Sequence, residues 1–276
     1  MAELPPGGRL DAPFEEPFEE SEYAMTISLS AHGSHVTIVT IDNPSKANAM
    51  SRAMLAELAD VWGQLDDDVA CRAIVVTGAG ERAFTAGADV SGDLSASEDT
   101  AAMINRALLK TESFSKPIIA AVNGACLGGG IELLLAADVR IAALHATFGL
   151  PEVRWAIYPF GGAAAKLVHQ IGHVQTMKLL LTAENIDADE AVRIGLINEV
   201  APADQVMERA IAVAETIAAN SPRAVQAVKR FVSSGSADAA LAREPFEQSL
   251  GDAVRASADF AEGVAAFRER RQPSYE

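Results

Sequence analysis

Positive charge is scarce in this sequence of 276 residues, and that scarcity excludes several kinds of partner. Lys and Arg number 22 against 38 Asp and Glu, which gives a formal net charge of −16. Binding to nucleic acid depends on neutralising phosphates with Lys and Arg, so this charge opposes it. It also opposes anionic membrane surfaces, and no apolar run reaches the ~18 residues that a membrane span needs. A small ligand bearing phosphate stays compatible, because it requires positive charge only locally.

Aromatic residues, cysteine and histidine are also few. Aromatic residues make up 5% of a chain that is 49% hydrophobic, so the core must consist mainly of Ala, Val, Leu and Ile. The two cysteines, Cys71 and Cys126, and the absence of a signal-peptide pattern predict free thiols in a reducing, cytoplasmic compartment. The five histidines show no metal-ligand spacing, so we expect no metal site.

The hydrophobic pattern divides the chain into three parts. Residues 1–24 are rich in acidic residues and proline, which predicts a disordered acidic tail. Residues 25–200 hold a predicted α/β core with largely parallel strands. The strands are predicted at 27–30, 36–41, 71–76, 117–122, 139–143 and 197–200, and the first helices at 51–65, 100–114 and 128–137. From residue 161 the pattern is mostly helical and Ala-rich, and residues 201–276 are predicted to form a helical oligomerisation region. Its helices are predicted at 203–220, 222–233, 238–257 and 259–270, after helices at 161–170, 173–181 and 187–194.

A dinucleotide-binding pattern, G-x-G-x-x-A, follows the strand predicted at 71–76. It comprises Gly78, Gly80 and Ala83. Such a motif binds a pyrophosphate only if a helix opens there and offers its N-terminal N–H groups. Gly87 would fall inside the second turn of that helix, and no apolar helical stripe continues. We therefore interpret these glycines as a turn that ends the strand.

Two glutamates lie in otherwise apolar stretches. Glu132 follows three glycines and precedes Leu133-Leu134-Leu135, and Glu152 lies in Phe148-Gly149-Leu150-Pro151-Glu152-Val153. A carboxylate is rarely buried without a partner or a function, because its desolvation is costly. The pair therefore indicates acid–base chemistry, and the alternative is two ordinary surface acids.

Two loops of small residues, 83–90 and 123–132, each follow a predicted buried strand. Small residues let a ligand approach the backbone, and glycine tolerates the turns that such loops require. One N–H from each loop, converging on one point, would form an oxyanion hole. The second loop also opens a helix, whose dipole favours negative charge.

These motifs resemble the crotonase superfamily, and most closely its enoyl-CoA hydratases. The resemblance covers roughly residues 25–273 and includes the segment 43–50, the Ala-Gly-Ala-Asp loop, the Gly-Gly-Gly-x-Glu loop, Pro151-Glu152 and the segment 262–271. It implies a crotonase-like spiral of repeated ββα units with a C-terminal helical oligomerisation region. It also implies a homo-oligomer, a trimer or a hexamer.

The resemblance also implies roles for single residues. Ala88 and Gly129 would donate backbone N–H groups to the thioester oxygen, and Glu132 and Glu152 would be the two catalytic carboxylates. Coenzyme A (CoA), as part of the acyl-CoA substrate and not as a separate cofactor, would bind at Lys46, Ala47 and Ala86, with Phe267 and Arg270 approaching its nucleotide.

The resemblance leaves several alternatives open. Arg270 is equally compatible with a solvated cation at a helix end, and Asp89 is expected to cap a helix rather than touch ligand. The bulky residues Trp155, Tyr158 and Phe160 would line the acyl pocket. Retention of both glutamates favours hydration of a 2-enoyl-CoA. The alternatives are an enoyl-CoA isomerase, another crotonase-type reaction such as hydrolysis or decarboxylation, and a catalytically silent CoA-binding paralogue.

Overall fold

The strands of this chain form two sheets, and from β3 to β8 successive strands belong alternately to one sheet and the other. The computed structural model describes residues 26–89, 98–112 and 114–275, so the predicted tail 1–24 lies outside the described residues. The larger sheet has the order β1-β2-β3-β5-β7-β10 and is parallel except for the β1–β2 pair. Its strands are β1 (Thr26–His32), β2 (Val36–Asp42), β3 (Ala73–Gly78), β5 (Ile118–Val122), β7 (Val139–Ala143) and β10 (Glu199–Ala201). The smaller sheet comprises β4 (Ala83–Thr85), β6 (Ala125–Leu127), β8 (Thr147–Gly149) and β9 (Ile186–Asp187).

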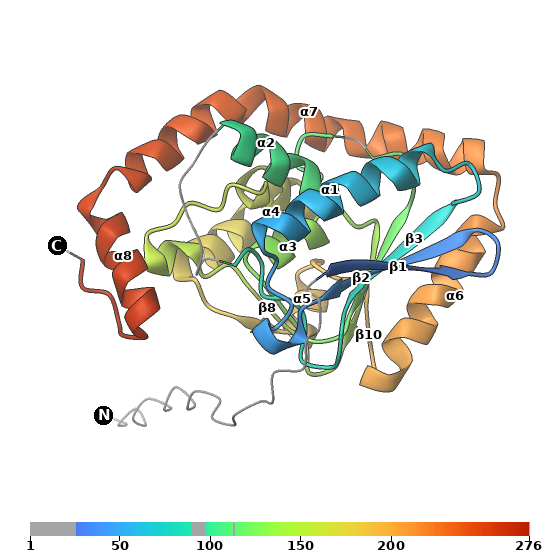
Figure 1. Cartoon of the computed structure of the whole chain (residues 1–276), viewed down its shortest axis with the longest axis horizontal. Helices are drawn as coiled ribbons and strands as arrows, with labels where there is room; N and C mark the ends of the chain where they lie inside the picture. Colours follow the sequence, from blue (N-terminus) through green and yellow to red (C-terminus); the bar gives the residue numbers. More distant parts are fainter. Residues whose placement is uncertain (1–25, 90–97, 113, 276) are drawn as a thin grey trace.

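The alternation arises from a repeated unit of two strands and a helix. In β3–β4–α2, β5–β6–α3 and β7–β8–α4 the first strand joins the larger sheet and the second joins the smaller one. The helices are α1 (Arg52–Asp67), α2 (Glu98–Ala107), α3 (Gly129–Leu134), α4 (Ala163–Thr182), α5 (Ala188–Arg193), α6 (Val206–Ala218), α7 (Pro222–Arg255) and α8 (Ala258–Glu269), with short 3₁₀ helices η1 (Pro44–Lys46), η2 (Glu152–Trp155) and η3 (Ala203–Gln205). This arrangement confirms the predicted α/β class with repeated ββα units (Figure 1).

The core is aliphatic, as the composition predicts. The strands β3 and β5 are buried along their whole length, and α6 packs against β3, β5 and β7. The buried Trp62 donates its indole N–H to the Ala107 carbonyl at 2.8 Å and thereby joins α1 to the end of α2. The second strands β4, β6 and β8 are absent from the sequence prediction, because three residues are too few to show a period-two pattern.

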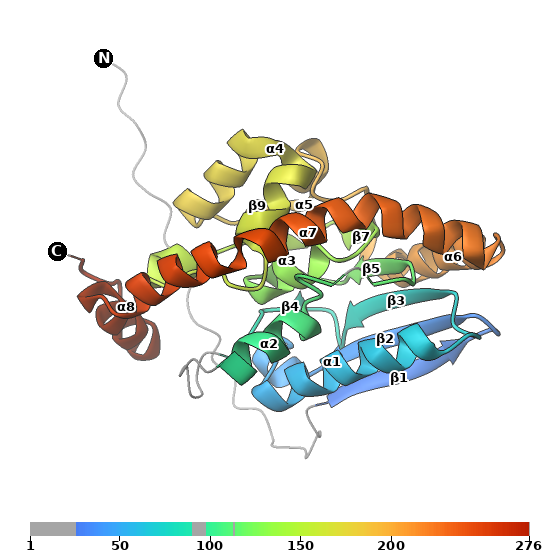
Figure 2. The same cartoon turned by 90° about the horizontal axis from the view of Figure 1, so that it is seen from above.

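The helix α7 is one element of 34 residues, whereas the sequence predicts two helices at 222–233 and 238–257. The predicted break at 234–237 contains Gly235, but the chain stays helical there, as it does at Pro245, because α7 packs on α4 and leads into α8. The opposite holds for α4, where Gly172 has φ 77° and kinks the helix between the two predicted segments. In Figures 1 and 2, α7 runs along one side of the molecule, and α8 turns back from its end toward η2.

Asn48 connects the end of β2 to the turn between β3 and β4. It is buried, has φ 56°, accepts a hydrogen bond from the Asn43 N–H at 3.0 Å, and donates to the carbonyls of Ala79 and Ala83 at 2.9 and 2.7 Å. Its own carbonyl accepts the Thr85 hydroxyl at 2.7 Å. Asparagine suits both tasks, since it tolerates the left-handed conformation and carries a donor and an acceptor.

We therefore predict that Asn48→Ala lowers the free energy of unfolding by about 2–4 kcal/mol, because two carbonyls and one N–H lose buried partners. Urea denaturation at fixed protein concentration measures the loss. The exposed Asn220, whose side-chain amide donates to the Thr216 carbonyl at the end of α6, gives the matched control Asn220→Ala. Equal, small losses in the two variants would contradict this assignment.

Candidate active site

The two glycine-containing loops meet at Gly87 and Gly129. Gly87 has φ 89°, and a Cβ built on it would lie 2.6 Å from the Gly129 nitrogen, so only glycine fits there. A Cβ built on Gly129 would lie 3.4 Å from the Ala88 nitrogen. The backbone nitrogens of Ala88 and Gly129 are therefore neighbours, as the sequence predicts for an oxyanion hole.

Both of these N–H groups are available. Ala88 is held by a parallel bridge to Met50, in which Met50 N donates to Gly87 O at 2.8 Å and Asp89 N donates to Met50 O at 2.9 Å. This pattern uses the residues on either side of Ala88 and leaves its own N–H unused. Gly129 is the first residue of α3, where N–H groups have no partner inside the helix. Within the described part of the chain, neither N–H has a hydrogen-bond acceptor.

Glu132 is buried in the first turn of α3. Its side chain is 5% exposed, and its Oε1 accepts a hydrogen bond from the Ala163 N–H at 3.3 Å. A Cβ built on Gly161 would lie 2.1 Å from Glu132 Oε2, so the absence of a side chain at 161 makes room for the carboxylate. Burial raises the pKa of Glu132 to about 7, and the Ala163 N–H opposes this rise.

Glu152 begins η2 and faces the start of α3. A Cβ built on Gly128 would lie 3.0 Å from Glu152 Oε1. Its Oε2 is buried and has no hydrogen-bond partner among the described residues. Burial raises the pKa of Glu152 to about 8, and the negative charge of Glu132 adds to the rise. Near neutral pH, the two carboxyl groups therefore hold roughly one proton between them.

The structure also groups the residues predicted to bind CoA near the first loop. Ala86 N donates to Ala47 O at 3.0 Å, directly after η1. Lys46 forms an ion pair of 2.9 Å with Asp89 and stays about half exposed. The helix that Asp89 was expected to cap would begin outside the described residues. A binding role for Lys46, Ala47 and Ala86 stays a prediction.

The predicted acyl-pocket and C-terminal residues lie where η2, α7 and α8 meet. The rings of Trp155 and Phe267 meet edge to face with centroids 5.3 Å apart, so α8 lies against η2 of its own chain. Tyr158 and Phe160 pack with centroids 5.1 Å apart, and Phe160 lies against Gly251 of α7. Arg270 ends α8 with φ 54° and is exposed, which leaves both predicted readings of this residue open.

Three further ionisable residues lie close to Glu132, and the sequence analysis does not identify them. Lys110 and Lys166 are buried cations, and Glu247 is a buried acid on α7. Each of the three charges acts on Glu132 or is acted on by it. Lys110 and Glu247 each have polar residues directly after them, and a single lysine such as Lys166 is common in a helix, so only burial in the folded chain distinguishes the three from surface residues.

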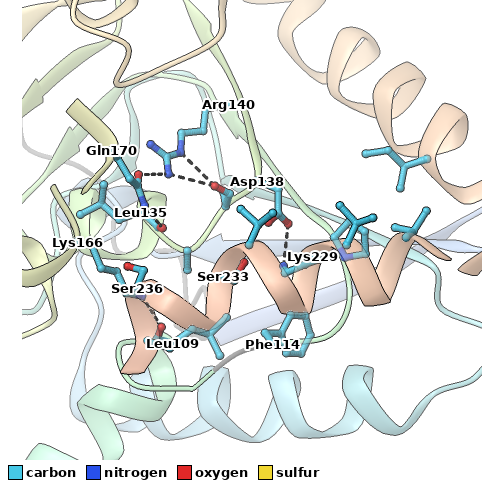
Figure 3. Close-up of a pocket in the computed structure, with 18 of the residues that line it drawn as sticks. Leu109, Phe114, Leu135, Asp138, Arg140, Lys166, Gln170, Lys229, Ser233 and Ser236 are labelled. Carbon is cyan, nitrogen blue, oxygen red and sulfur yellow. Dashed lines mark hydrogen bonds and ion pairs between the residues drawn. The ribbon is translucent and has the colours of Figure 1, made fainter. Parts of the chain in front are cut away.

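A cavity of about 960 Å³ lies elsewhere, between α4, α7 and the start of β7 (Figure 3). Its lining includes three cationic residues, each with a structural partner. Lys229 pairs with Asp138 at 2.7 Å, and Lys166 donates to the Leu109 carbonyl. Arg140 donates to the Leu196 carbonyl at 2.8 Å and to the Ala137 carbonyl, in the turn between α3 and β7. Neither Glu132 nor Glu152 lines this cavity.

The remaining sequence features have structural roles. After Gly78 and Gly80 the chain enters the strand β4 and not a helix, so the pyrophosphate-binding geometry is not formed. Both cysteine thiols are buried, and burial raises the pKa of each.

Across residues 26–89, 98–112 and 114–275, no cluster of three or more His, Cys, Asp or Glu suits a metal ion. In the same residues, no helix is both long and apolar enough to cross a membrane.

Known proteins are similar to this chain over most of its length. The family model described as enoyl-CoA hydratase/isomerase matches residues 31–276. An enoyl-CoA hydratase of Mycobacterium tuberculosis is 36% identical over 249 residues, covering 88% of this chain and 93% of the relative. A short-chain-enoyl-CoA hydratase of Clostridium acetobutylicum is 38% identical over 244 residues, covering 86% and 92%.

A solved structure is similar over the same extent. The crystal structure of an enoyl-CoA hydratase/isomerase from Pseudoalteromonas atlantica superimposes with a TM-score of 0.83 at 30% identity, covering 91% of this chain and 99% of that one. The family model and these relatives span both glycine-containing loops, both glutamates and the C-terminal helices. This chain belongs to the enoyl-CoA hydratase/isomerase family of the crotonase superfamily.

Proposed function

We propose that this protein hydrates a 2-enoyl-CoA thioester. The observation that carries the proposal is a buried and a half-buried glutamate, each with a raised pKa, beside two neighbouring N–H groups that have no acceptor among the described residues. Hydration requires a base for water and an acid for carbon, and a pair that holds one proton supplies both. The names of the relatives, which include several hydratases, agree with this proposal.

In the proposed step, water adds across the double bond of the thioester. The oxygen of water bonds to Cβ of the conjugated thioester while one of its protons passes to the ionised Glu132. The electron pair of the double bond moves to Cα, and the protonated Glu152 supplies a proton there. Negative charge that grows on the thioester oxygen is stabilised by the N–H groups of Ala88 and Gly129, at ~3 kcal/mol per donor. No electrons leave the substrate, so the reaction needs no redox cofactor.

Glu132 is the better base of the two for a structural reason. The N–H groups of Ala163 and Gly161 stabilise its ionised form, whereas the N–H of its own residue acts on Glu152, whose Oε2 has no donor among the described residues. The first ionisation of the pair therefore belongs to Glu132, and Glu152 keeps the proton. An isomerase moves a proton between two carbons and requires only one such group, so two glutamates with raised pKa values favour hydration.

We propose that Lys46, Ala47 and Ala86 bind the CoA portion. The exposed ammonium group of Lys46 supplies the local positive charge that a phosphate requires, in a protein whose net charge is −16. Phe267 lies on α8, which packs against η2, and Arg270 follows the last residue of α8. Tyr158, Phe160 and Trp155 are proposed to contact the acyl group.

Replacing either glutamate by glutamine is expected to lower the rate of hydration about 10²–10⁴-fold, because each variant loses one proton-transfer group. Loss of conjugated-thioester absorbance with crotonyl-CoA measures the rate. Calorimetric binding of a saturated acyl-CoA is the control, and it should stay within a few-fold of wild type. Near-full turnover in a Glu132→Gln or Glu152→Gln variant would remove that residue from the mechanism.

The oxyanion hole is tested by Gly129→Pro against Gly129→Ala. Proline deletes the donor and should cost ~10²–10³ in rate, whereas alanine keeps the N–H and should cost less. Proline is well tolerated at the first position of a helix, which Gly129 occupies, and circular dichroism with thermal melting checks the fold. A folded Gly129→Pro variant with normal turnover would show that the thioester oxygen is not held there.

We also propose that the protein is a homo-oligomer, a trimer or a hexamer. The helix α7 exposes a group of large apolar side chains, with Phe231 85% and Val232 72% exposed, and such groups on soluble proteins mark contact surfaces. Light scattering should give three or six times the mass of one chain at micromolar concentration. The variant Phe231→Glu/Val232→Glu should reduce this mass, whereas Val69→Glu, an exposed valine before β3, should not. A single-chain mass for wild type would refute the proposal.

A further inference from the structure

A buried ion pair stands beside Glu132 and has no part in the proposed reaction. Lys110, three residues beyond α2, is 2% exposed, and its Nζ lies 2.7 Å from Glu247 Oε2 and 3.6 Å from Glu244 Oε1. Glu247 is 7% exposed and lies on α7. Burying both charges requires desolvation that the attraction of the pair often fails to offset, so their contribution to stability alone is a weak explanation for the pair.

Two consecutive glycines, Gly161 and Gly162, lie between the ion pair and Glu132. A Cβ built on Gly161 would lie 2.1 Å from Glu132 Oε2, and one built on Gly162 would lie 3.0 Å from Lys110 Cγ. The dipeptide is thus a spacer without side chains, with the glutamate on one side and the lysine on the other. Lys166, one turn into α4, donates to the Leu109 carbonyl and fixes the backbone next to Lys110 (Figure 3).

Only one of the two carboxylate oxygens of Glu247 has a partner in the described part of the chain. Glu247 Oε1 is buried and has no hydrogen-bond partner among the described residues, although Oε2 is paired. A buried carboxylate oxygen without a donor is costly, and its charge acts strongly on its neighbours because little water screens it. One neighbour is Tyr158, whose pKa burial and the charge of Glu247 raise to about 12. The field of Glu247 therefore reaches the proposed acyl pocket.

We propose that Lys110 and Glu247 are positioning residues that set the charge state of Glu132 across the Gly161–Gly162 spacer. The inference rests on the proposed hydration, in which Glu132 must be ionised to accept a proton from water. The two residues act in opposite directions. Lys110 stabilises the ionised glutamate, and Glu247 opposes that effect, so the base is neither fully ionised and weak nor fully protonated and inactive.

The charges that face Glu132 come from each element around it. Lys110 follows α2, Lys166 lies on α4, and Glu247 lies on α7 with Glu244 beside its lysine. Glu152 of η2 is the partner carboxyl. Among these, Lys110 lowers the pKa of Glu132 and Glu247 raises it, against the larger effect of burial.

The test is the pH dependence of kcat/KM in Lys110→Met, Glu247→Gln and the double variant. The rate rises with pH as Glu132 ionises, so its acid limb follows the pKa of Glu132. Losing Lys110 should move the limb about 1 pH unit higher, and losing the charge of Glu247 should move it about 1 unit lower. The double variant should return close to wild type. Lys110→Arg keeps the charge and should retain the wild-type limb.

The matched control is Lys229→Met, which removes another buried lysine from an ion pair of 2.7 Å. It should lower the thermal midpoint without moving the limb. Shifts of the same sign in Lys110→Met and Glu247→Gln, or an unmoved limb in both, would overturn the proposal. If Lys110→Met does not fold, Glu247→Gln alone decides, because its limb must lie below that of wild type.

A second readout separates this inference from the proposed function. Infrared titration follows the C=O stretch of a protonated carboxyl group, and the band missing in Glu132→Gln belongs to Glu132. Its midpoint should move up in Lys110→Met and down in Glu247→Gln even in a protein that hydrates no enoyl-CoA. Absent turnover with these shifts refutes the function only, whereas normal turnover without them refutes the inference only.

Discussion

The burial of two carboxyl groups close to one another is the constraint on which the site depends. An ionised carboxylate in apolar surroundings is costly, and a second one beside it adds repulsion, so the pair shares a proton near neutral pH. The surroundings then distinguish the two groups. Glu132 receives the Ala163 N–H and the field of Lys110, whereas Glu152 Oε2 receives no donor among the described residues. The glycines at 128 and 161 leave the space that each carboxylate occupies.

The fold could be predicted where single segments carry a clear pattern. The buried strands β3 and β5 and the amphipathic α1 show their nature locally, and the prediction of largely parallel strands is confirmed. The strands β4, β6 and β8 could not be predicted. Each is only three residues long, and each acquires its strand geometry by pairing with a neighbouring strand of the smaller sheet. The continuous α7 was also missed. Gly235 and Pro245 are unfavourable inside a helix, but contacts with α4 and α8 override a local preference.

In the candidate site, too, residues with a distinctive local sequence could be predicted and the others could not. Glu132 and Glu152 were identifiable because a glutamate among apolar neighbours is conspicuous in one short window of sequence. The meeting of Ala88 with Gly129 was expected from the family resemblance, and the structure supplies its physical reason in the glycine at 87. Lys110 and Glu247 were not identifiable, since their partners stand far away in the chain and each has polar neighbours in sequence. Long-range pairing of charges leaves no local pattern.

The position of α7 and α8 also affects the order in which the protein folds during its synthesis. Glu247 neutralises Lys110 beside a glutamate of α3, and Phe267 packs on Trp155 next to the other glutamate. Tyr275 then donates its hydroxyl to the Arg154 carbonyl at 2.6 Å. During synthesis, at roughly 5–20 residues per second, the ββα units emerge well before these contacts can form. The nascent core therefore carries an uncompensated lysine and an uncovered indole until α7 and α8 emerge, and the candidate site acquires its final surroundings only when these two helices dock.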